Sequence, residues 1–369
     1  MSLRVCLVSL EVFAWGRYGG VGKATRDIAR GLARRGVDVH VVTPRGGGQG
    51  EVEELDGFTV HGHRLAAYPF TGPLFREVGA DVYHSHEPGW GTAVAMDAVD
   101  GAAHIVTCHN PRDWDDWERC RRFYGPRRRL YNLLVEPRVK EAVRKADAVF
   151  CQSRHIQQKA RLIYGLRSEP GFLPNPVDVP EREPVKSGEP TVCFLGRLDP
   201  EKNPEGLMRL ARGFPDVRFI VAGRAHNDKR DRLVRELLGG YRNVELRGFV
   251  DGPEKEELLD ESWILVNTSH VECLPVAFLE AAAHRCAVLS RHDPDGFSSR
   301  FGCHVEADGY EAGLRWLLED ERWRGRGEAG FSYVSEVHEM GKVIDLHLEH
   351  YRRILEEIGA TPRPGIGAP

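Results

Sequence analysis

Short apolar runs alternate with helix-length amphipathic segments along most of this chain. RVCLVSL at 4–10 is a continuous apolar run, the pattern of a strand buried on both faces of a parallel sheet. The next segment carries Ile28 and Leu32 at helical spacing, and Gly36 ends it. Further strands are expected at 37–44, 81–87, 103–110 and 147–153. This alternation predicts a doubly wound α/β domain with a parallel sheet.

The second half of the chain repeats the pattern, with strands expected at 190–198, 217–225, 244–250, 263–269 and 286–292. Between the halves, residues 170–190 hold six prolines and little periodicity, which favours a linker. We therefore predict an N-terminal domain over 1–178 and a C-terminal domain over 179–335. An amphipathic helix over 336–358 is expected to cross back to the first domain, and a disordered tail to follow over 359–369.

Composition narrows the functional class. A chain of 369 residues suits two domains, and no apolar run approaches the roughly 18 residues that a membrane span needs. The eight cysteines show no CxxC spacing, so we expect reduced thiols in a cytoplasmic protein and no zinc site. A net charge of −4 argues against a dedicated nucleic-acid binder.

The glycine-rich stretch 16–25 resembles a nucleotide loop but fits neither common motif. A Walker A loop needs Gly at position 17 and Ser or Thr at position 24, where this chain has Arg17 and Ala24. A dinucleotide fingerprint needs a third small residue where Thr25 stands, which disfavours an NAD-dependent dehydrogenase. Two interpretations stay open: a tight turn into the helix, or a backbone cradle for an anion supported by Lys23.

HVECLPVAFLEAAA at 270–283 is the most informative stretch. Pro275 suits the first position of a helix, so Glu272 lies just before the helix N-terminus and Glu280 in its second turn. A free helix N-terminus attracts a diphosphate, because its N–H groups are unpaired and carry partial positive charge. Glu272 could then bind sugar hydroxyls and Glu280 ribose hydroxyls; alternatively, Glu280 is a surface charge.

Two cations are expected at the same edge of the second sheet. FLGRLDPEKNP at 194–204 follows a strand and carries Arg197 and Lys202. Arginine binds phosphate in bidentate fashion and lysine supplies a point charge, so together they suit a diphosphate. The alternative is that Arg197 only forms a solvated pair with Glu201.

These motifs, in this order, resemble glycosyltransferase family 4 (glycosyl transferases group 1). The resemblance rests on GRLDPEKNP, VAGRA, NVELRGFV and VNTSHVECLPVAFLEAAA in the second half, and on YGGVGKATRDIARGLARRG, HSHE, VTCHN and LPNPVDV in the first. It implies the GT-B fold, in which two Rossmann-like domains face each other across a cleft. It also implies a metal-independent hexosyltransferase that uses a nucleotide-sugar and retains the anomeric configuration.

The resemblance also assigns roles to individual residues. Arg197 and Lys202 would bind the donor diphosphate, Glu272 the transferred sugar and Glu280 the ribose. His109 would contact the sugar from the first domain. The remaining donor-binding positions are Gly19 and Gly20 near the phosphates, the main chain at Phe249 and Val250 near the base, and Cys273, Leu274 and Pro275.

This chain departs from the family pattern at a few positions. Cys273 replaces the usual glycine after the first glutamate, and Arg285 and Ala287 stand where Gly and Pro are common. An altered donor preference is therefore expected more readily than a loss of activity. No cofactor or metal is expected: Asp113 and Asp115 offer carboxylates, but in the domain opposite the donor.

The hydroxyl acceptor is left open between a small molecule, a glycan and a lipid-linked molecule. Six arginines and no acid lie between Arg119 and Arg129, followed by leucines up to residue 134. Residues 119–134 are either a solvated helical face or a peripheral contact with the inner face of a membrane. The competing functions are a nucleotide-sugar epimerase of similar build and a non-catalytic nucleotide-sugar binding protein.

Overall fold

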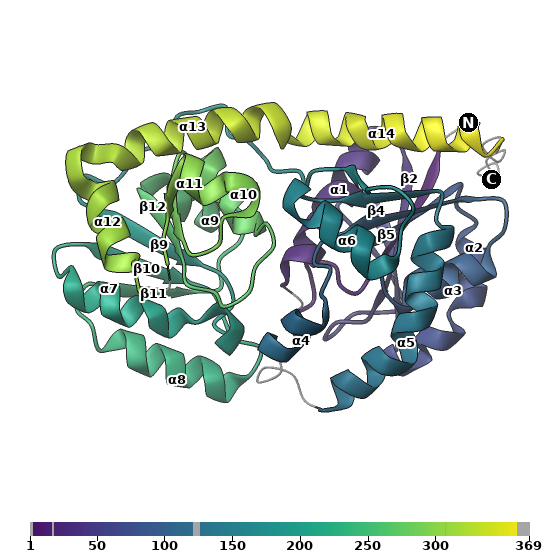
Figure 1. Cartoon of the computed structure of the whole chain (residues 1–369), viewed down its shortest axis with the longest axis horizontal. Helices are drawn as coiled ribbons and strands as arrows, with labels where there is room; N and C mark the ends of the chain where they lie inside the picture. The colour runs from purple at the N-terminus through teal and green to yellow at the C-terminus, as the bar shows by residue number, and fades with distance from the viewer. Residues whose placement is uncertain (1–2, 17, 121–125, 307, 360–369) are drawn as a thin grey trace. The chain divides into compact units, whose positions relative to one another are not determined.

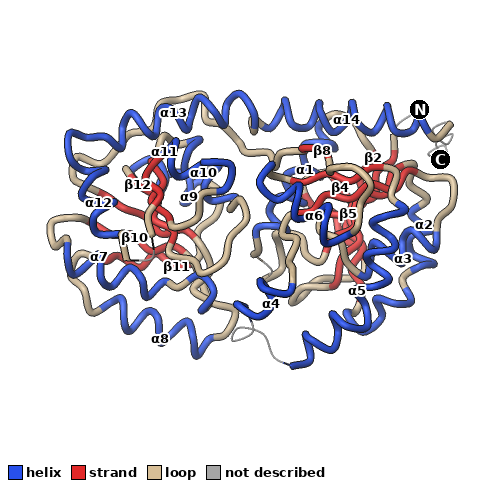
Figure 2. Tube along the Cα trace, viewed as in Figure 1, coloured by secondary structure: helices blue, strands red, loops and turns tan. Residues whose placement is uncertain are grey.

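The computed structural model describes residues 3–16, 18–120, 126–306 and 308–359, without the side chains of residues 114, 119–120 and 126–134. The chain divides into two compact units. The first unit consists of the residues up to Pro176 and of those from Met340 onward, and the second unit runs from Val177 to Glu339. The division thus lies two residues before the predicted boundary at 178. In each unit, helices surround a central sheet (Figures 1 and 2).

The first unit is built on an eight-stranded sheet with the order β3-β4-β2-β1-β5-β6-β7-β8. Its parallel strands are β1 (Arg4–Ser9), β2 (Asp38–Pro44), β4 (Phe58–His63), β5 (Val82–His86), β6 (Ala103–Cys108), β7 (Ala148–Cys151) and β8 (Gly171–Phe172). The strands expected from apolar runs are confirmed at β1, β2, β5, β6 and β7. The side chains of the central strands β1, β5 and β6 are almost entirely buried, since helices cover both faces of the sheet.

One edge of this sheet departs from the parallel pattern. The strand β3 (Val52–Leu55) pairs antiparallel with β4 through a two-residue turn at Asp56 and Gly57, whose φ angles are 51° and 88°. Asp-Gly is the preferred pair for such a turn, because both central residues need positive φ. We did not predict this hairpin, since β3 is mostly exposed and lacks an apolar run.

All but the last of the helices in the first unit connect its strands. They are α1 (Gly20–Arg34), η1 (Leu65–Phe70), α2 (Gly72–Val78), α3 (Trp90–Ala98), α4 (Trp114–Cys120), α5 (Pro126–Lys145), η3 (Arg154–Ile156), α6 (Gln157–Tyr164) and α14 (Met340–Glu357). The last of these packs against α1: a Cβ on Gly31 would lie 2.5 Å from Ile344, and Arg35 pairs with Asp345 at 2.6 Å. The glycine is required for this close approach.

The predicted helix over 336–358 begins later than expected. Residues 336 and 337 belong to α13 (Arg322–Val337), and the break before Met340 separates that helix from α14. The C-terminal helix thus belongs to the first unit although the second unit precedes it in sequence. Most of the predicted tail, residues 360–369, lies outside the described residues.

The second unit contains a six-stranded parallel sheet with the order β11-β10-β9-β12-β13-β14. Its strands are β9 (Thr191–Leu195), β10 (Arg218–Ala222), β11 (Val244–Gly248), β12 (Ile264–Asn267), β13 (Ala287–Ser290) and β14 (Gly302–His304). The first five confirm the expected strands. The sixth has only three residues and no apolar run by which to predict it.

Apolar clusters on both faces of this sheet form the core of the second unit. The helical segments are η4 (Pro200–Lys202), η5 (Pro204–Gly206), α7 (Leu207–Gly213), α8 (Asp228–Gly239), α9 (Pro253–Glu261), α10 (Val276–Ala283), η6 (Pro294–Gly296), α11 (Phe297–Phe301), α12 (Tyr310–Leu318), η7 (Glu319–Glu321) and α13. None of the helices in the described ranges is long and apolar enough to cross a bilayer.

Candidate active site

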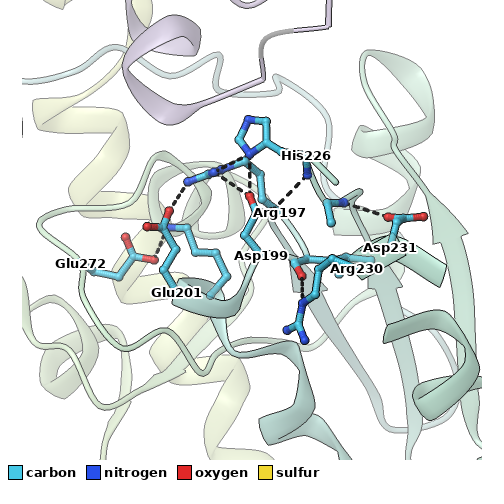
Figure 3. A network of polar contacts seen from close by, with 10 residues as sticks. Arg197, Asp199, Glu201, His226, Arg230, Asp231 and Glu272 are labelled. Atoms are coloured by element: carbon cyan, nitrogen blue, oxygen red, sulfur yellow. Dashed lines mark hydrogen bonds and ion pairs between the residues drawn. The ribbon is translucent and has the colours of Figure 1, made fainter. Parts of the chain in front are cut away.

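The loops after β9 and β10 meet at the carboxyl edge of the second sheet, where ligands bind in open α/β folds. Gly223 has a φ of 150°, and a Cβ on it would lie 1.8 Å from the carbonyl oxygen of Gly196. The loops can touch only because this position has no side chain. The first turn of α8 holds both loops, since Arg230 donates to the Leu198 carbonyl at 3.1 Å and Asp231 accepts from the Ala225 amide at 2.8 Å (Figure 3).

Arg197 follows β9 and lies within a polar network (Figure 3). Its Nη1 is 2.7 Å from Asp199 Oδ2 and 3.0 Å from His226 Nδ1, and its Nη2 pairs with Glu201. His226 is in turn 2.7 Å from Asp199. The pair with Glu201, which we considered as an alternative to phosphate binding, is therefore present, and it is partly buried.

Lys202 and Glu272 are paired, with 2.6 Å between Nζ and Oε1. The turn η4 ends at Asn203 in a left-handed conformation, which Thr268 fixes by donating to the Asn203 carbonyl at 2.7 Å. This contact ties the loop after β9 to the loop after β12. Burial would raise the pKa of Glu272, but the charge of Lys202 and hydrogen bonds to the carboxylate outweigh it and lower that pKa. Glu272 is thus an anion at neutral pH.

The helix α10 begins beside Glu272. We expected Pro275 to be the first residue of the helix, but it is the residue before the helix, with ψ at 136°. Within the described residues, no side chain caps this end of the helix. Neighbouring residues differ in exposure: Leu274 is buried in the core, whereas Cys273 is partly exposed. The main-chain N–H groups at the start of α10 thus provide partial positive charge next to Lys202.

Glu280 is paired with a lysine that the sequence analysis did not single out. Lys255, in the first turn of α9, lies 2.8 Å from Glu280 Oε1, so Glu280 is not an isolated surface charge. The loop between β11 and α9 carries the two residues expected near the base. Phe249 is 38% exposed, whereas the side chain of Val250 lies in the core, so only its main chain could meet a ligand.

His109 follows β6 in the first unit and is 5% exposed. Burial lowers the pKa of its imidazole to about 4, so the ring is neutral at neutral pH. The carboxylate of Glu87 accepts from the backbone N–H groups of His109 and Asn110 at 2.6 and 2.7 Å. Glu87 has a φ of 69°, which turns its side chain back to this loop. Glu87 is the last residue of the HSHE motif, but the sequence alone does not indicate its role, because that role depends on this backbone conformation.

The glycine loop before α1 already holds an anion. Gly19 precedes the helix, and a Cβ on it would lie 2.0 Å from Oε1 of Glu11, which also accepts from the Gly22 amide at 3.2 Å. Lys23, which would support an anion here under one of the two open interpretations, pairs with Asp27. Gly20 is the first residue of the helix. A donor phosphate at this loop would have to compete with the Glu11 carboxylate.

The sequence analysis considered two further regions, the acidic stretch around Asp113 and the basic stretch 119–134. Asp113 and Asp116 both pair with Lys159, Asp115 is exposed on α4, and no cluster of three potential metal ligands occurs among the described residues. The basic stretch 119–134 lies outside the described side chains.

Two protein families match successive segments of the chain. Residues 18–181 match Glycosyltransferase Family 4, and residues 178–323 match Glycosyl transferases group 1. The chain is a family 4 glycosyltransferase. The two matches meet next to the boundary between the two units, so each unit corresponds to one of these two families.

Similar proteins agree with this assignment. The chain is 26% identical over 364 residues to a phosphatidyl-myo-inositol mannosyltransferase of Mycolicibacterium smegmatis, which covers 87% of this chain and 85% of that protein. Sucrose-phosphate synthase from Thermosynechococcus elongatus aligns with a TM-score of 0.75 at 18% identity, over 96% of this chain and all of the other. Anabaena HepE, solved in complex with UDP-glucose, aligns with a TM-score of 0.71 at 14% identity, over 97% of this chain and all of the other. The glycosyltransferase therefore has the GT-B fold.

Proposed function

We propose that this glycosyltransferase moves a hexosyl group from a nucleotide-diphosphate sugar to an acceptor hydroxyl, with retention of configuration and without a metal ion. The observation that carries the proposal is the contact between Lys202 and Glu272 beside the uncapped start of α10. A phosphate-binding cation, a helix N-terminus and a carboxylate that can accept from sugar hydroxyls then lie at one sheet edge. These groups suit the two halves of a sugar diphosphate.

The diphosphate would exchange places with carboxylates. Arg197 contacts Asp199 and Glu201, and Lys202 contacts Glu272, so each cation already has an anionic partner. Phosphate oxygens can replace these partners with similar geometry, because arginine binds carboxylate and phosphate alike. Binding is therefore expected to weaken with rising salt.

The transfer step needs charge stabilisation more than an added acid. The bond between the anomeric carbon and the donor phosphate oxygen breaks, through an oxocarbenium-like state. The acceptor oxygen forms the new bond on the same face, and its proton passes to an oxygen of the departing nucleoside diphosphate. Arg197, Lys202 and the start of α10 stabilise the negative charge that grows on that group, and electrostatic stabilisation of this kind is usually the largest catalytic contribution.

The remaining residues orient the donor. Glu272 would accept from hydroxyls of the transferred sugar, and Glu280 from the ribose hydroxyls. The main chain at 249–250 would contact the base. Neutral His109 would approach the sugar without placing a second positive charge beside the oxocarbenium-like centre.

A thermal-shift screen with UDP-glucose, GDP-mannose and ADP-glucose tests the donor class. A ligand at 100 times its Kd adds about 2.7 kcal/mol of apparent stability, which such a screen detects. HepE was solved with UDP-glucose, and a pneumococcal O-GlcNAc transferase with UDP and GlcNAc, which makes UDP-sugars the first donors to test. No shift with any of these nucleotide-sugars would contradict the proposal.

Turnover separates the competing functions. An epimerase would convert the sugar of the donor without an acceptor, whereas a transferase releases nucleoside diphosphate and forms a glycoside. A binding protein would show the thermal shift alone. NMR of the glycoside formed from an α-linked donor tests retention, and activity in the presence of excess EDTA tests metal independence.

A lipid-linked acceptor at the inner face of the cytoplasmic membrane fits two observations. The mannosyltransferase relative is named for phosphatidyl-myo-inositol. In addition, Leu65 and Phe70 of η1 are 65% and 78% exposed. Arg64, which directly precedes Leu65, is exposed as well. Exposed apolar side chains next to a basic residue are typical of interfacial contact. Co-sedimentation with phosphatidylglycerol liposomes at low salt tests this, and an absence of binding would exclude it.

A further inference from the structure

Four buried imidazoles follow one another through the first unit, starting at His109. Nε2 of His109 lies 3.3 Å from Nδ1 of His86. The ring of His86 packs against that of His84, with 4.6 Å between centroids, and His84 packs against His347 of α14 at 5.6 Å. This row connects the C-terminal helix to the histidine that the proposed function brings to the sugar.

The far end of the row is fixed by hydrogen bonds. Nδ1 of His84 is 2.7 Å from the Tyr351 hydroxyl, and its Nε2 is 2.8 Å from the Thr107 hydroxyl. The Tyr351 hydroxyl is also 3.3 Å from Nδ1 of His347. Because both nitrogens of His84 have partners, its ring has one defined orientation. It thus provides a rigid surface on which the ring of His86 packs.

All four rings are neutral at neutral pH. Each is buried, and burial together with repulsion between the rings lowers the pKa values of His84 and His86 far below their ordinary range. A neutral imidazole has one N–H group and one lone pair, so a contact between two such rings needs a defined donor and acceptor. In the contact with His86, one ring must therefore donate and the other accept, so the tautomer of His109 is coupled to that of His86.

We propose that His86 is a positioning residue for the transfer reaction, which holds the His109 ring in one tautomer and orientation so that Nδ1 is the nitrogen that meets the transferred sugar. The inference rests on the proposed function for what His109 contacts, but not for the tautomer itself. Packing alone would not require an imidazole at position 86. Its Nε2 is buried without a hydrogen-bond partner in the described part of the chain, an arrangement that costs stability and that a leucine would avoid.

The test compares two substitutions of His86 with a matched control. H86L removes the contact with His109, whereas H86N keeps a polar atom close to the position of Nδ1. The control is H61L, because His61 forms a similar contact with His40, 2.9 Å between ring nitrogens, elsewhere in the same sheet. Two readouts are used: release of nucleoside diphosphate from UDP-glucose, GDP-mannose and ADP-glucose, and the tautomer of His109 from long-range ¹H–¹⁵N spectra of the histidine-labelled full chain.

We expect H86L to lower kcat by about 100-fold with little change in KM, the scale of a reacting group displaced by an ångström. H86N should recover most of that loss, and H61L should match the wild type. The His109 spectrum should show one tautomer in the wild type and in H86N, and a mixture in H86L. The inference is overturned if folded H86L keeps wild-type kcat, or if His109 keeps the same single tautomer in H86L. If the wild type releases no diphosphate from these donors, the proposed function fails, and the spectra still decide the tautomer.

Discussion

Lys202 Nζ and Glu272 Oε1 lie 2.6 Å apart, although they belong to loops that follow different strands, β9 and β12. One residue is expected at the donor diphosphate and the other at the transferred sugar. Their contact therefore links the two halves of the proposed donor site. Removing either charge leaves the other without its partner in a largely buried position, so a single substitution is expected to disturb both halves.

Replacing Glu272 with glutamine should lower turnover by about 100-fold to 1000-fold, comparable to the loss of one strong charge-stabilising contact. The fold should persist, because glutamine keeps the size of the side chain. Steady-state release of nucleoside diphosphate measures the effect. E245Q is the control, since Glu245 lies near the amino end of β11 and forms ion pairs with Arg218 and Arg247, none of which is assigned to the donor site. Unchanged turnover in E272Q would remove Glu272 from the site, whereas E245Q should be unaffected.

Substitution of Arg197 by alanine should weaken the binding of UDP or GDP by about 2 kcal/mol, roughly 30-fold, as expected for a hydrogen-bonded charge on phosphate. Isothermal titration calorimetry measures this affinity. R224A is the matched control: Arg224 lies in the neighbouring loop, is exposed, and pairs only weakly with exposed Asp228 at 3.1 Å. Normal affinity in R197A would exclude the proposed phosphate contact.

A methyl group on Gly223 should destabilise the second unit by more than about 2 kcal/mol, because it adds a backbone clash to an unfavourable positive φ. The loops after β9 and β10 would separate, so nucleotide binding should weaken as well. G188A is the comparison, since a Cβ there meets nothing within 4 Å. Equal melting temperatures of G223A and G188A would contradict the close contact.

The buried histidines should make the first unit sensitive to acid. Burial lowers the pKa of His109 to about 4 and that of His347 to about 3, so both are neutral in the folded state. The unfolded chain binds these protons below about pH 6.5, so stability should fall as pH drops from 6.5 towards 4. Each such histidine contributes about 1.4 kcal/mol per pH unit in that window.

Urea unfolding at pH 7.5, 6.0 and 5.0 measures this dependence. H347Q removes one titrating group. The number of protons taken up on unfolding should therefore fall by about one, and the free energy of unfolding should depend less steeply on pH. H155Q is a control, because His155 lies on the exposed turn η3 and is not part of the row. If the free energy of unfolding of H347Q had the same pH dependence as that of the wild type, a lowered pKa of His347 would be wrong.

Much of the candidate site could be predicted before the fold was known. Arg197, Lys202, Glu272 and Glu280 follow or flank strands whose apolar runs are strong, and parallel strands bring their carboxyl ends to one edge. The partners of these residues could not be predicted in the same way. Lys255 and His226 reach Glu280 and Arg197 from helices and loops distant in sequence, and no local pattern specifies such contacts.

The sequence by itself determined the alternation of strands and helices, the two domains and the order of the charged motifs, because these depend on periodicity and on residue types at strand ends. Tertiary structure alone decided which charges pair and that Glu11 lies at the glycine loop. It also decided that α14 brings His347 and Tyr351 to the row of histidines behind His109. Those relationships join residues up to 267 positions apart, and only the packed fold brings such distant side chains within contact distance.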